Sequence, residues 1–307
     1  MPIPIAVVGL GKIAHDQHLP TLAASADFTL AASVSRHARV NGVANFADLA
    51  TAFEARPDIE AVALCTPPVG RHRLARAALA AGRHVLLEKP PGAALAEVAD
   101  LAALAAARGL SLFASWHARC ADAIEPARAW LAGRRVRRVQ ITWKEDVRQW
   151  HPGQDWIFAP GGMGVFDPGI NALSIATRIL PRPFMLSRAR LDFPAGRGAP
   201  IAADLVFEDA DGAPITAAFD LRQAGLQSWD IAVETDAGRL RLESGGARLI
   251  IDGRAQPLET GSEYARLYAR FAELVRTRAS EADTSPLVHV ADAFMLGERR
   301  EVEPFHW

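Results

Sequence analysis

The chain has 307 residues, of which half are hydrophobic, and its formal net charge is −1 with the histidines neutral. A chain of this length with so much apolar sequence can bury a substantial core, in one large domain or two ordinary ones. Acidic and basic residues are interspersed, which argues against a nucleic-acid groove or a charged membrane-binding stripe and leaves a small molecule as the expected partner.

The spacing of cysteines and histidines, together with the N-terminal stretch, indicates the cellular compartment and whether to expect a metal. Cys65 and Cys120 are the only cysteines and have no metal-ligand or C-x-x-C spacing, which is typical of a reducing compartment. His15 and His18 lack a third ligand, so we expect no metal site. The stretch MPIPIAVVGL has no charged leader ahead of its apolar run, and no apolar stretch is long enough to span a bilayer. We therefore expect a cytoplasmic protein.

The first part of the chain alternates short apolar runs with helical patterns. The runs are IPIAVVGL, TLAASVS, AVALCT, HVLLE and SLFASWH, and segments such as GRHRLARAALAAG separate them. Strands and helices in alternation form parallel strands joined by right-handed crossovers, with helices on both faces of the sheet. The sequence therefore predicts an α/β fold that begins with a doubly wound Rossmann domain over residues 1–118.

From about Arg119 the pattern changes to alternating runs separated by tight turns. VRRVQITWKEDV, ADLVFED, PITAAFDL and WDIAVET are typical of strands, and DADG, DAG and DG are turn signals. PGINALSIATRIL and SEYARLYARFAELVRTRA have helical periodicity. We expect an α+β domain over residues 119–307 with a large, mostly antiparallel open sheet. Because the exposed face of such a sheet needs cover, we also expect a homodimer or a higher homo-oligomer formed through it.

The turn after the first predicted strand has the spacing of a dinucleotide motif. VVGLGKIA places Gly9, Gly11 and Ala14 in the pattern G-x-G-x-x-G/A, between a strand and a helix of the first βαβ unit. Gly9 allows the tight turn, Gly11 allows a pyrophosphate to approach the backbone, and Ala14 lets the helix pack closely on the strand. The helix N-terminus adds a partial positive charge. A structural turn without a ligand is the alternative.

The end of the second predicted strand indicates which cofactor to expect. A carboxylate there usually holds the ribose 2′-hydroxyl, but AASVSRHARV offers Ser35 and Arg36 instead. Since a guanidinium binds phosphate in a bidentate manner, this pair favours NADP, with NAD still possible. The alternative for Arg36 is an ordinary solvated side chain.

Three further stretches resemble a known family across essentially the whole chain. GLGKIA, ALCTPPVGRHRLARAALAAGRHVLLEKP and GGMGVFDPGIN are similar to segments of the glucose-fructose oxidoreductase and inositol dehydrogenase family (Gfo/Idh/MocA), and the Glu-Lys-Pro stretch at 88–90 is the most specific of them. The resemblance implies nicotinamide-dependent oxidoreduction of a sugar or polyol. We expect these residues to contact the cofactor: Gly9, Gly11, Lys12, Ile13, Ser35, Arg36, Thr66, Pro67, His72, Glu88 and Lys89.

One position departs from the family pattern. Many members carry D-x-G-x-H with the histidine as the proposed acid–base residue, whereas DPGIN places Asn171 there. An amide cannot accept a proton at neutral pH, so attention moves to Asp167 and Lys89. This version resembles the aldose 1-dehydrogenases of the family, which act on D-galactose and L-arabinose. The implied reaction oxidises C1 of a pyranose to the aldonolactone.

We expect Lys89, Asp167 and Asn171 to be the catalytic residues. Asp167 is assigned as the base, and Asn171, four residues later, faces the same side of a helix and orients the substrate. Lys89, at the carboxyl edge of the parallel sheet, stabilises the developing alkoxide, so that both charged groups meet around the C1 hydroxyl. Lys89 and Asp167 can exchange roles. The alternative for Asp167 is a helix N-cap, with Pro168 at the first helical position.

The segment KEDVRQWHPGQDW follows a predicted strand and has the composition of a substrate loop. Glu145 and His151 are candidates for sugar-hydroxyl contacts, Trp150 for an apolar wall, and His117 for a further contact. Each of them is equally well explained as a solvated loop residue or a packing residue.

Two other functions remain open on the sequence. One is a dehydrogenase of the same family that acts on inositol or another polyol or sugar derivative. The other is an NADP-dependent sensor of a sugar pathway without catalysis, which the presence of both Lys89 and Asp167 disfavours.

Overall fold

The computed structural model describes residues 1–307, which form two compact units. The first unit contains Met1–His117 and Ser262–Thr284, and the second contains Ala118–Gly261 and Ser285–Trp307. The expected second domain ran from residue 119 to the end, whereas residues 262–284 return to the first unit. No helix combines the length and the apolar character needed to cross a membrane.

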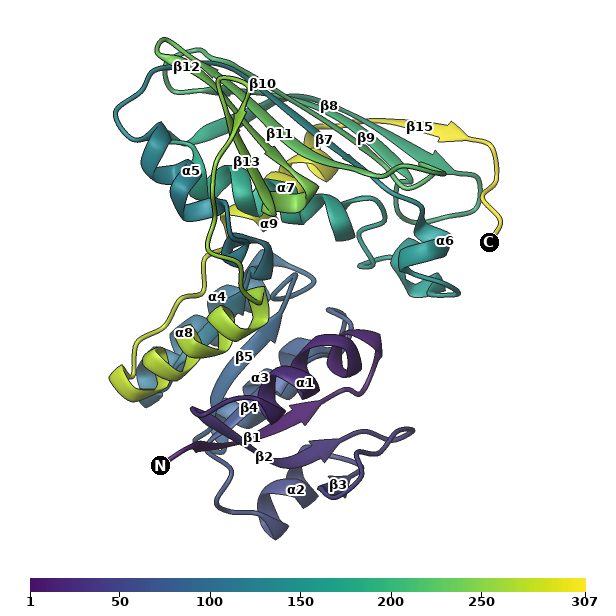
Figure 1. Ribbon diagram of the computed structural model, residues 1–307. Coiled ribbons are helices and arrows are strands. Elements are labelled where there is room, and N and C mark those ends of the chain that lie inside the picture. Colours follow the sequence, from purple (N-terminus) through teal and green to yellow (C-terminus); the bar gives the residue numbers. More distant parts are fainter. The chain divides into compact units, whose positions relative to one another are not determined.

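The first unit is built on a six-stranded sheet, as the alternating pattern predicts. Its strands are all parallel and lie in the order β3-β2-β1-β4-β5-β6, which is the Rossmann order (Figure 1). The strands are β1 (Ile3–Val8), β2 (Phe28–Val34), β3 (Ala44–Phe46), β4 (Ala61–Leu64), β5 (His84–Glu88) and β6 (Leu112–Ser115). The carboxyl ends of β1, β4 and β5 are neighbours in this order, so the residues that follow them gather at one edge of the sheet.

Helices connect these strands. They are α1 (Leu19–Ala23), which continues a π-helical turn at Ala14–His18, then α2 (Leu49–Ala55), α3 (Arg71–Ala80) and α4 (Leu95–Arg108). The late helix α8 (Glu263–Thr277) completes the unit. Its buried residues recur every three or four positions, so the helix has one apolar face, as the amphipathic pattern predicts.

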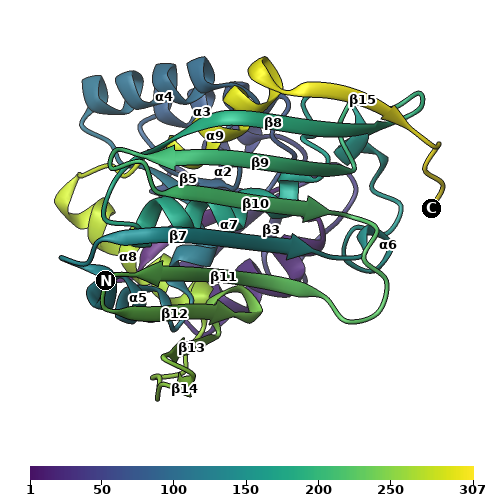
Figure 2. The ribbon, with the colours of Figure 1, turned by 90° about the horizontal axis from the view of Figure 1, so that it is seen from above.

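The second unit is built on a nine-stranded, mostly antiparallel sheet, which confirms the expected fold class. Figure 2 shows its strands side by side in the order β14-β13-β12-β11-β7-β10-β9-β8-β15. Only the pairs β7–β10 and β8–β15 are parallel. The strands are β7 (Val136–Lys144), β8 (Phe184–Pro194), β9 (Ala202–Asp209), β10 (Pro214–Asp220), β11 (Ser228–Thr235), β12 (Gly238–Glu243), β13 (Arg248–Ile251), β14 (Arg254–Ala255) and β15 (Glu298–Val302).

Helices cover one face of this second sheet (Figure 1). They are α5 (Ile124–Leu131), α7 (Phe166–Ile179) and α9 (Ser285–Leu296), while the short α6 (Val147–Trp150) follows β7. Strand residues alternate between the buried face and the open face, so β10 buries Ile215, Ala217 and Phe219. Gly169 of α7 allows that helix to lie close to the sheet, because a Cβ there would come 2.8 Å from the ring of Phe219.

Candidate active site

The turn after β1 depends on glycine for steric reasons. Gly9 has φ of +87°, and a Cβ on it would lie 2.8 Å from Thr66 Cγ2 and 3.0 Å from the Thr66 nitrogen. Gly11 is exposed, and a Cβ there would meet no protein atom within 4 Å. Beside this turn the hydroxyl oxygen of Thr66 is buried without a hydrogen-bond partner. An open backbone, a helix start and an unpaired hydroxyl are suited to a pyrophosphate, so the residues present fit a dinucleotide.

The neighbouring candidates for cofactor contact lie around this turn. Lys12 and Ile13 begin the helix after β1, and the exposed Lys12 ammonium pairs with Asp16. Pro67 is an exposed residue of the loop after β4.

The end of β2 presents a guanidinium that no other group holds. Arg36 is exposed and makes no hydrogen bond or ion pair. Ser35 precedes it, and its Oγ accepts bonds from the backbone nitrogens of His37 at 3.3 Å and Ala38 at 3.2 Å, which shapes the loop. Neither of these two residues is acidic, and Arg36 carries a positive charge. The loop therefore fits an anionic group.

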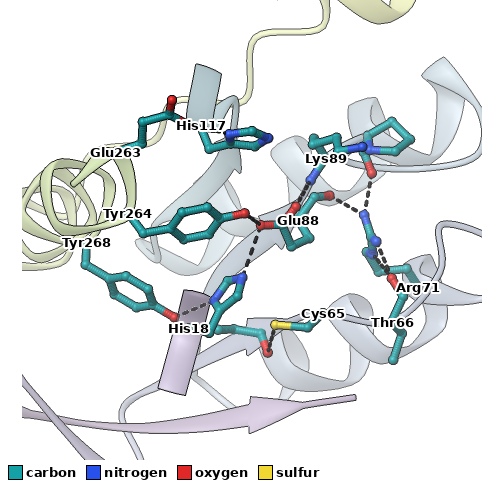
Figure 3. Close-up of polar contacts among 12 residues, drawn as sticks. His18, Cys65, Thr66, Arg71, Glu88, Lys89, His117, Glu263, Tyr264 and Tyr268 are labelled. Atoms are coloured by element: carbon teal, nitrogen blue, oxygen red, sulfur yellow. Dashed lines mark hydrogen bonds and ion pairs between the residues drawn. The ribbon is translucent and has the colours of Figure 1, made fainter. Parts of the chain in front are cut away.

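Arg71 organises the edge of the sheet beyond β4 and β5. This buried residue begins α3, and its Nε donates to the carbonyl oxygen of Thr66 at 3.0 Å. Its terminal nitrogens donate to the carbonyls of Thr66, Glu88 and Pro90 (Figure 3). One side chain thereby ties the loop after β4 to the residues that flank Lys89.

Glu88, expected among the cofactor contacts, is buried and bonded inside the protein instead. Its Oε1 accepts hydrogen bonds from the hydroxyl of Tyr264 at 2.7 Å and from Nε2 of His18 at 3.1 Å, and its Oε2 accepts the backbone N–H of Lys89 at 2.8 Å. The residue is 3 % exposed. Glu88 therefore contacts the backbone of Lys89 from the interior of the first unit.

The electrostatics of this group follow from its burial and its charges. Burial alone raises the pKa of Glu88, but the hydrogen bond and charge of His18, the charge of His117 and the Tyr264 hydroxyl lower it to about 2. Burial opposes a charge on His18, yet Coulombic effects of Cys65 and Tyr268 and hydrogen bonds with Cys65 and Glu88 raise its pKa well above the usual value. Glu88 and His18 therefore form a buried ion pair at neutral pH.

Two other histidines expected to touch ligands are engaged with protein groups. His117 Nδ1 lies 2.8 Å from a carboxylate oxygen of Glu263, and its ring stacks on Tyr264 with centroids 5.5 Å apart. His72 Nε2 lies 2.8 Å from Asp100 of α4, which also binds Arg76. His72 therefore links α3 to α4, and its expected contact with the cofactor stays a prediction.

In the second unit, a glycine-rich loop sets the start of α7. A Cβ on Gly162 would lie 1.9 Å from the carbonyl oxygen of Trp156, and one on Gly164 would lie 2.1 Å from that of Pro200. The helix then begins at Phe166, with Val165 as its N-cap and no side chain capping it. Asp167 is therefore inside the first turn, and its alternative assignment as the N-cap is wrong.

Three polar side chains predicted for substrate and catalysis come together in this unit. His151 Nε2 lies 3.6 Å from Asp167 Oδ2 and 3.9 Å from Glu145 Oε1. Asp167 and Glu145 are buried, at 3 % and 5 % exposed, while His151 is half-buried. The backbone of Glu145 extends strand β7, where its N–H donates to the carbonyl of Asp220 at 2.9 Å. Two carboxylates thus face one imidazole.

Aromatic and amide groups complete the cluster. Trp229 of β11 donates from Nε1 to Glu145 Oε2 at 2.9 Å, and Trp150 packs edge-on against Trp229 with ring centroids 5.4 Å apart. One turn after Asp167, the side-chain oxygen of Asn171 is buried with no hydrogen-bond partner. A buried acceptor without a partner is costly, so this oxygen is suited to a ligand hydroxyl.

The sequence did not predict the contacts that several residues make around these sites. They are Arg71, His18, Tyr264, Tyr268 and Trp229. Tyr264 and Tyr268 are the only tyrosines of the chain and stand four apart on an amphipathic helix, so their hydroxyls point to one buried face. Arg71 and His18 carry no such signal, because nothing in the pattern marks them as buried.

Comparisons with known proteins agree with this reading of the two units. A family model described as an oxidoreductase family with an NAD-binding Rossmann fold matches residues 3–115. The chain belongs to this family, Gfo/Idh/MocA. Over 305 residues it is 45% identical to the galactose 1-dehydrogenase of Pseudomonas fluorescens, and the match covers 99% of both chains.

Solved structures give the same result. The crystal structure of a D-galactose-1-dehydrogenase from Rhizobium etli superposes with a TM-score of 0.95 at 57% identity, covering 99% of this chain and 98% of that chain. A 3-ketoreductase from Actinomadura kijaniata, solved with NADP and TDP-benzene, has a TM-score of 0.86 at 20% identity and covers 98% of this chain and all of its own. At that identity the second likeness concerns the fold alone.

Proposed function

We propose that this protein oxidises C1 of D-galactose and L-arabinose to the aldonolactone, with a nicotinamide dinucleotide as oxidant. The observation that carries the proposal is the buried carboxylate of Asp167, with His151 beside it and the unpartnered oxygen of Asn171 one turn away. Similarity over the full length to two galactose 1-dehydrogenases supports the choice of sugar. The two sugars share the configuration of their ring carbons and differ only in the hydroxymethyl group.

The reaction removes two hydrogens from the anomeric carbon and its hydroxyl. A nicotinamide dinucleotide, held at the glycine turn after β1, would supply the acceptor for the C1 hydrogen and its electron pair. Asp167 accepts the hydroxyl proton, and the Lys89 ammonium stabilises the negative charge that develops on that oxygen. The C1–O bond becomes the carbonyl of the lactone.

The remaining groups bind and orient the sugar. Asn171 accepts a hydrogen bond from a ring hydroxyl through its buried Oδ1, while Glu145 and His151 hold further hydroxyls. Trp150 supplies an apolar surface, as carbohydrate sites commonly require. His117, which belongs to the first unit, contributes a further contact in this proposal.

For the cofactor we propose a preference for NADP over NAD. The exposed Arg36 guanidinium has no internal partner, and Ser35 beside it offers a hydroxyl. A 2′-phosphate meets both groups, whereas the 2′-hydroxyl of NAD finds no carboxylate.

The Arg36→Ala variant tests this preference. We expect the KM for NADP to rise about tenfold while that for NAD changes less than twofold, because a charge-assisted bond to phosphate is worth roughly 1.5–3 kcal/mol. Arg39→Ala, on the same exposed loop, is the matched control. Equal effects on both cofactors in Arg36→Ala would contradict the assignment.

We also propose a homo-oligomer formed through the open face of the nine-stranded sheet. Helices cover one face of this sheet, and the other carries half-exposed small residues such as Thr142, Ala218 and Ala232. Cys65 and Cys120 are not joined in a disulfide, which suits a reducing compartment such as the cytoplasm. A monomeric mass in sedimentation would contradict the oligomer.

Substrate oxidation is tested by following reduced cofactor with purified protein. The panel contains D-galactose, L-arabinose, D-glucose and myo-inositol, each with NADP and with NAD. We expect D-galactose and L-arabinose to give the highest kcat/KM. Turnover of inositol alone would indicate a polyol dehydrogenase, and cofactor binding without any turnover would indicate a sensor.

A further inference from the structure

A buried polar cluster in the first unit takes no direct part in the proposed chemistry. His18, Glu88, Tyr264 and Tyr268 are at most 3 % exposed. Burying an ionised carboxylate and an imidazolium is costly, and replacing such a pair by apolar residues is often neutral or stabilising. Stability alone therefore does not account for the cluster, and its position directly before Lys89 suggests another purpose.

The cluster fixes the peptide nitrogen of Lys89 through the Glu88 side chain. Glu88 Oε2 accepts that N–H at 2.8 Å, while Oε1 is held by Tyr264 at 2.7 Å and by His18 at 3.1 Å (Figure 3). The other ring nitrogen of His18 lies 2.7 Å from the hydroxyl of Tyr268. Each group in this chain of contacts has its orientation set by the next one.

The carbonyls on either side of Lys89 are held from the opposite direction. Arg71 donates to the carbonyl oxygens of Glu88 and Pro90, and the same guanidinium is anchored on Thr66. The backbone at Lys89 is thus bonded on its N–H and on both flanking carbonyls. Little freedom is left for the Cα from which the ammonium extends.

The hydroxyls of Tyr264 and Tyr268 come from α8, a helix that ring stacking and a hydrogen bond hold in place. On α8, Phe271 stacks between Phe28 and Phe113, with centroids 5.6 and 6.0 Å apart. Ser111 Oγ donates to the Leu274 carbonyl at 2.8 Å. A helix from a remote part of the sequence is therefore a fixed platform for Tyr264 and Tyr268.

We propose that Tyr264 and His18 are positioning residues for Lys89, acting by orienting the Glu88 carboxylate that fixes the Lys89 peptide. This inference rests on the proposed function, which makes Lys89 the group that stabilises the alkoxide. A displacement of a catalytic group by about 1 Å costs up to 10²-fold in rate, so loosening this carboxylate reduces turnover without touching the sugar or the cofactor.

Kinetics of two matched variants form the first test. Tyr264→Phe removes only the hydroxyl on Glu88, and we expect kcat to fall about tenfold with KM for sugar and cofactor within twofold. Tyr268→Phe removes the hydroxyl one contact further away, on His18, and we expect a loss of less than about threefold. Equal kcat in Tyr264→Phe and the parent protein, or a change in KM alone, would overturn the proposal.

A pair at His18 separates positioning from packing. His18→Gln keeps an N–H that reaches Glu88, whereas His18→Leu fills the space without a donor. We expect the glutamine variant to recover most of the kcat that the leucine variant loses, even where both melt at the same temperature. Activities that follow only the melting temperature would mean that the cluster is merely structural.

A readout independent of turnover uses the scarcity of lysine. The chain has only Lys12, Lys89 and Lys144, so reductive ¹³C-dimethylation gives few lysine signals in NMR. We expect Tyr264→Phe to shift and broaden the Lys89 signal and to leave Lys144 unchanged. If the parent protein oxidises no sugar, the proposed function fails and this spectrum alone decides the positioning: an unchanged Lys89 signal would refute it.

Discussion

At the scale of single residues, the proposal that Asp167 is the base rests on its surroundings. It lies inside the first turn of α7 rather than at the N-cap position, which Val165 occupies. Burial at 3 % exposed and His151 at 3.6 Å distinguish it from the surface aspartates of the same unit. A buried carboxylate near an imidazole and an amide is a typical acid–base arrangement.

Substituting Asp167→Asn tests this role. An amide has the same shape but accepts no proton at neutral pH, so we expect kcat to fall by roughly 10² or more with little change in the KM for the cofactor. Asp211→Asn, in the exposed turn between β9 and β10, is the control and keeps full activity. Near-normal turnover in Asp167→Asn would move the proton-accepting role to Lys89.

For single residues, the sequence predicted local geometry but not contacts between distant parts of the chain. The glycine spacing and the four-residue interval between Asp167 and Asn171 predicted local geometry, because backbone sterics and helix periodicity are local. The N-cap alternative failed because the helix begins two residues earlier than expected, at Phe166 with Val165 as its N-cap. Glu88 was expected at the cofactor, but whether its carboxylate faces outward or inward depends on donors from α8, which lie 176 residues away.

At the scale of elements, α8 illustrates the same limit. The apolar stripe of SEYARLYARFAELVRTRA predicted a half-buried helix, and Ser262 caps it by accepting the N–H of Ala265 at 3.3 Å. A stripe shows that one face is buried but not what covers it. Residues 262–284 therefore appeared to continue the second domain, whereas they pack in the first unit.

The two tyrosines of α8 allow the burial of this helix to be tested by a pH titration. Burial and the charge of Glu88 raise the pKa of Tyr264 well above 10, and burial, opposed by the charge of His18, raises that of Tyr268 to about 12. Since both folded pKa values exceed the unfolded value of about 10, the stability they contribute is complete below pH 10 and is lost as pH rises toward 12.

A titration that follows tyrosinate by ultraviolet absorbance therefore reports whether the hydroxyls of α8 are buried, because no other tyrosine is present. We expect no tyrosinate signal near pH 10 in the folded protein and full titration near pH 10 in denaturant. A signal at about pH 10 while circular dichroism still reports the folded state would mean that these hydroxyls are not buried.

The segment after β7 is held in place by residues that lie far from it in the sequence. It carries Trp150 and His151 and continues into a turn at Asp155, where Trp307 Nε1 donates to the aspartate at 2.8 Å and Arg197 donates at 3.0 Å. Phe305 packs on Phe158 with centroids 5.3 Å apart. The sequence predicted the polar and aromatic composition of this loop, but not the residues that hold it in place.

At the scale of the whole molecule, each of the two sheets follows from a different sequence pattern. Alternation of strand and helix predicted a parallel sheet, and short strands with tight turns predicted an antiparallel one; both are present because each pattern reports which backbone connections are possible. Of the residues in the proposed reaction, the glycine turn and Lys89 belong to the first unit and Asp167 belongs to the second. Sequence alone could not assign residues 262–284, since membership of a unit depends on tertiary packing.

The most direct measurement uses D-galactose that carries deuterium at C1, with NADP and the purified protein. If the sugar is oxidised at its anomeric carbon, the reduced cofactor gains one deuterium, the sugar product is the unlabelled lactone, and single turnovers are slower than with ordinary galactose. Reduced cofactor without the label, or no reduction at all, would contradict oxidation at C1.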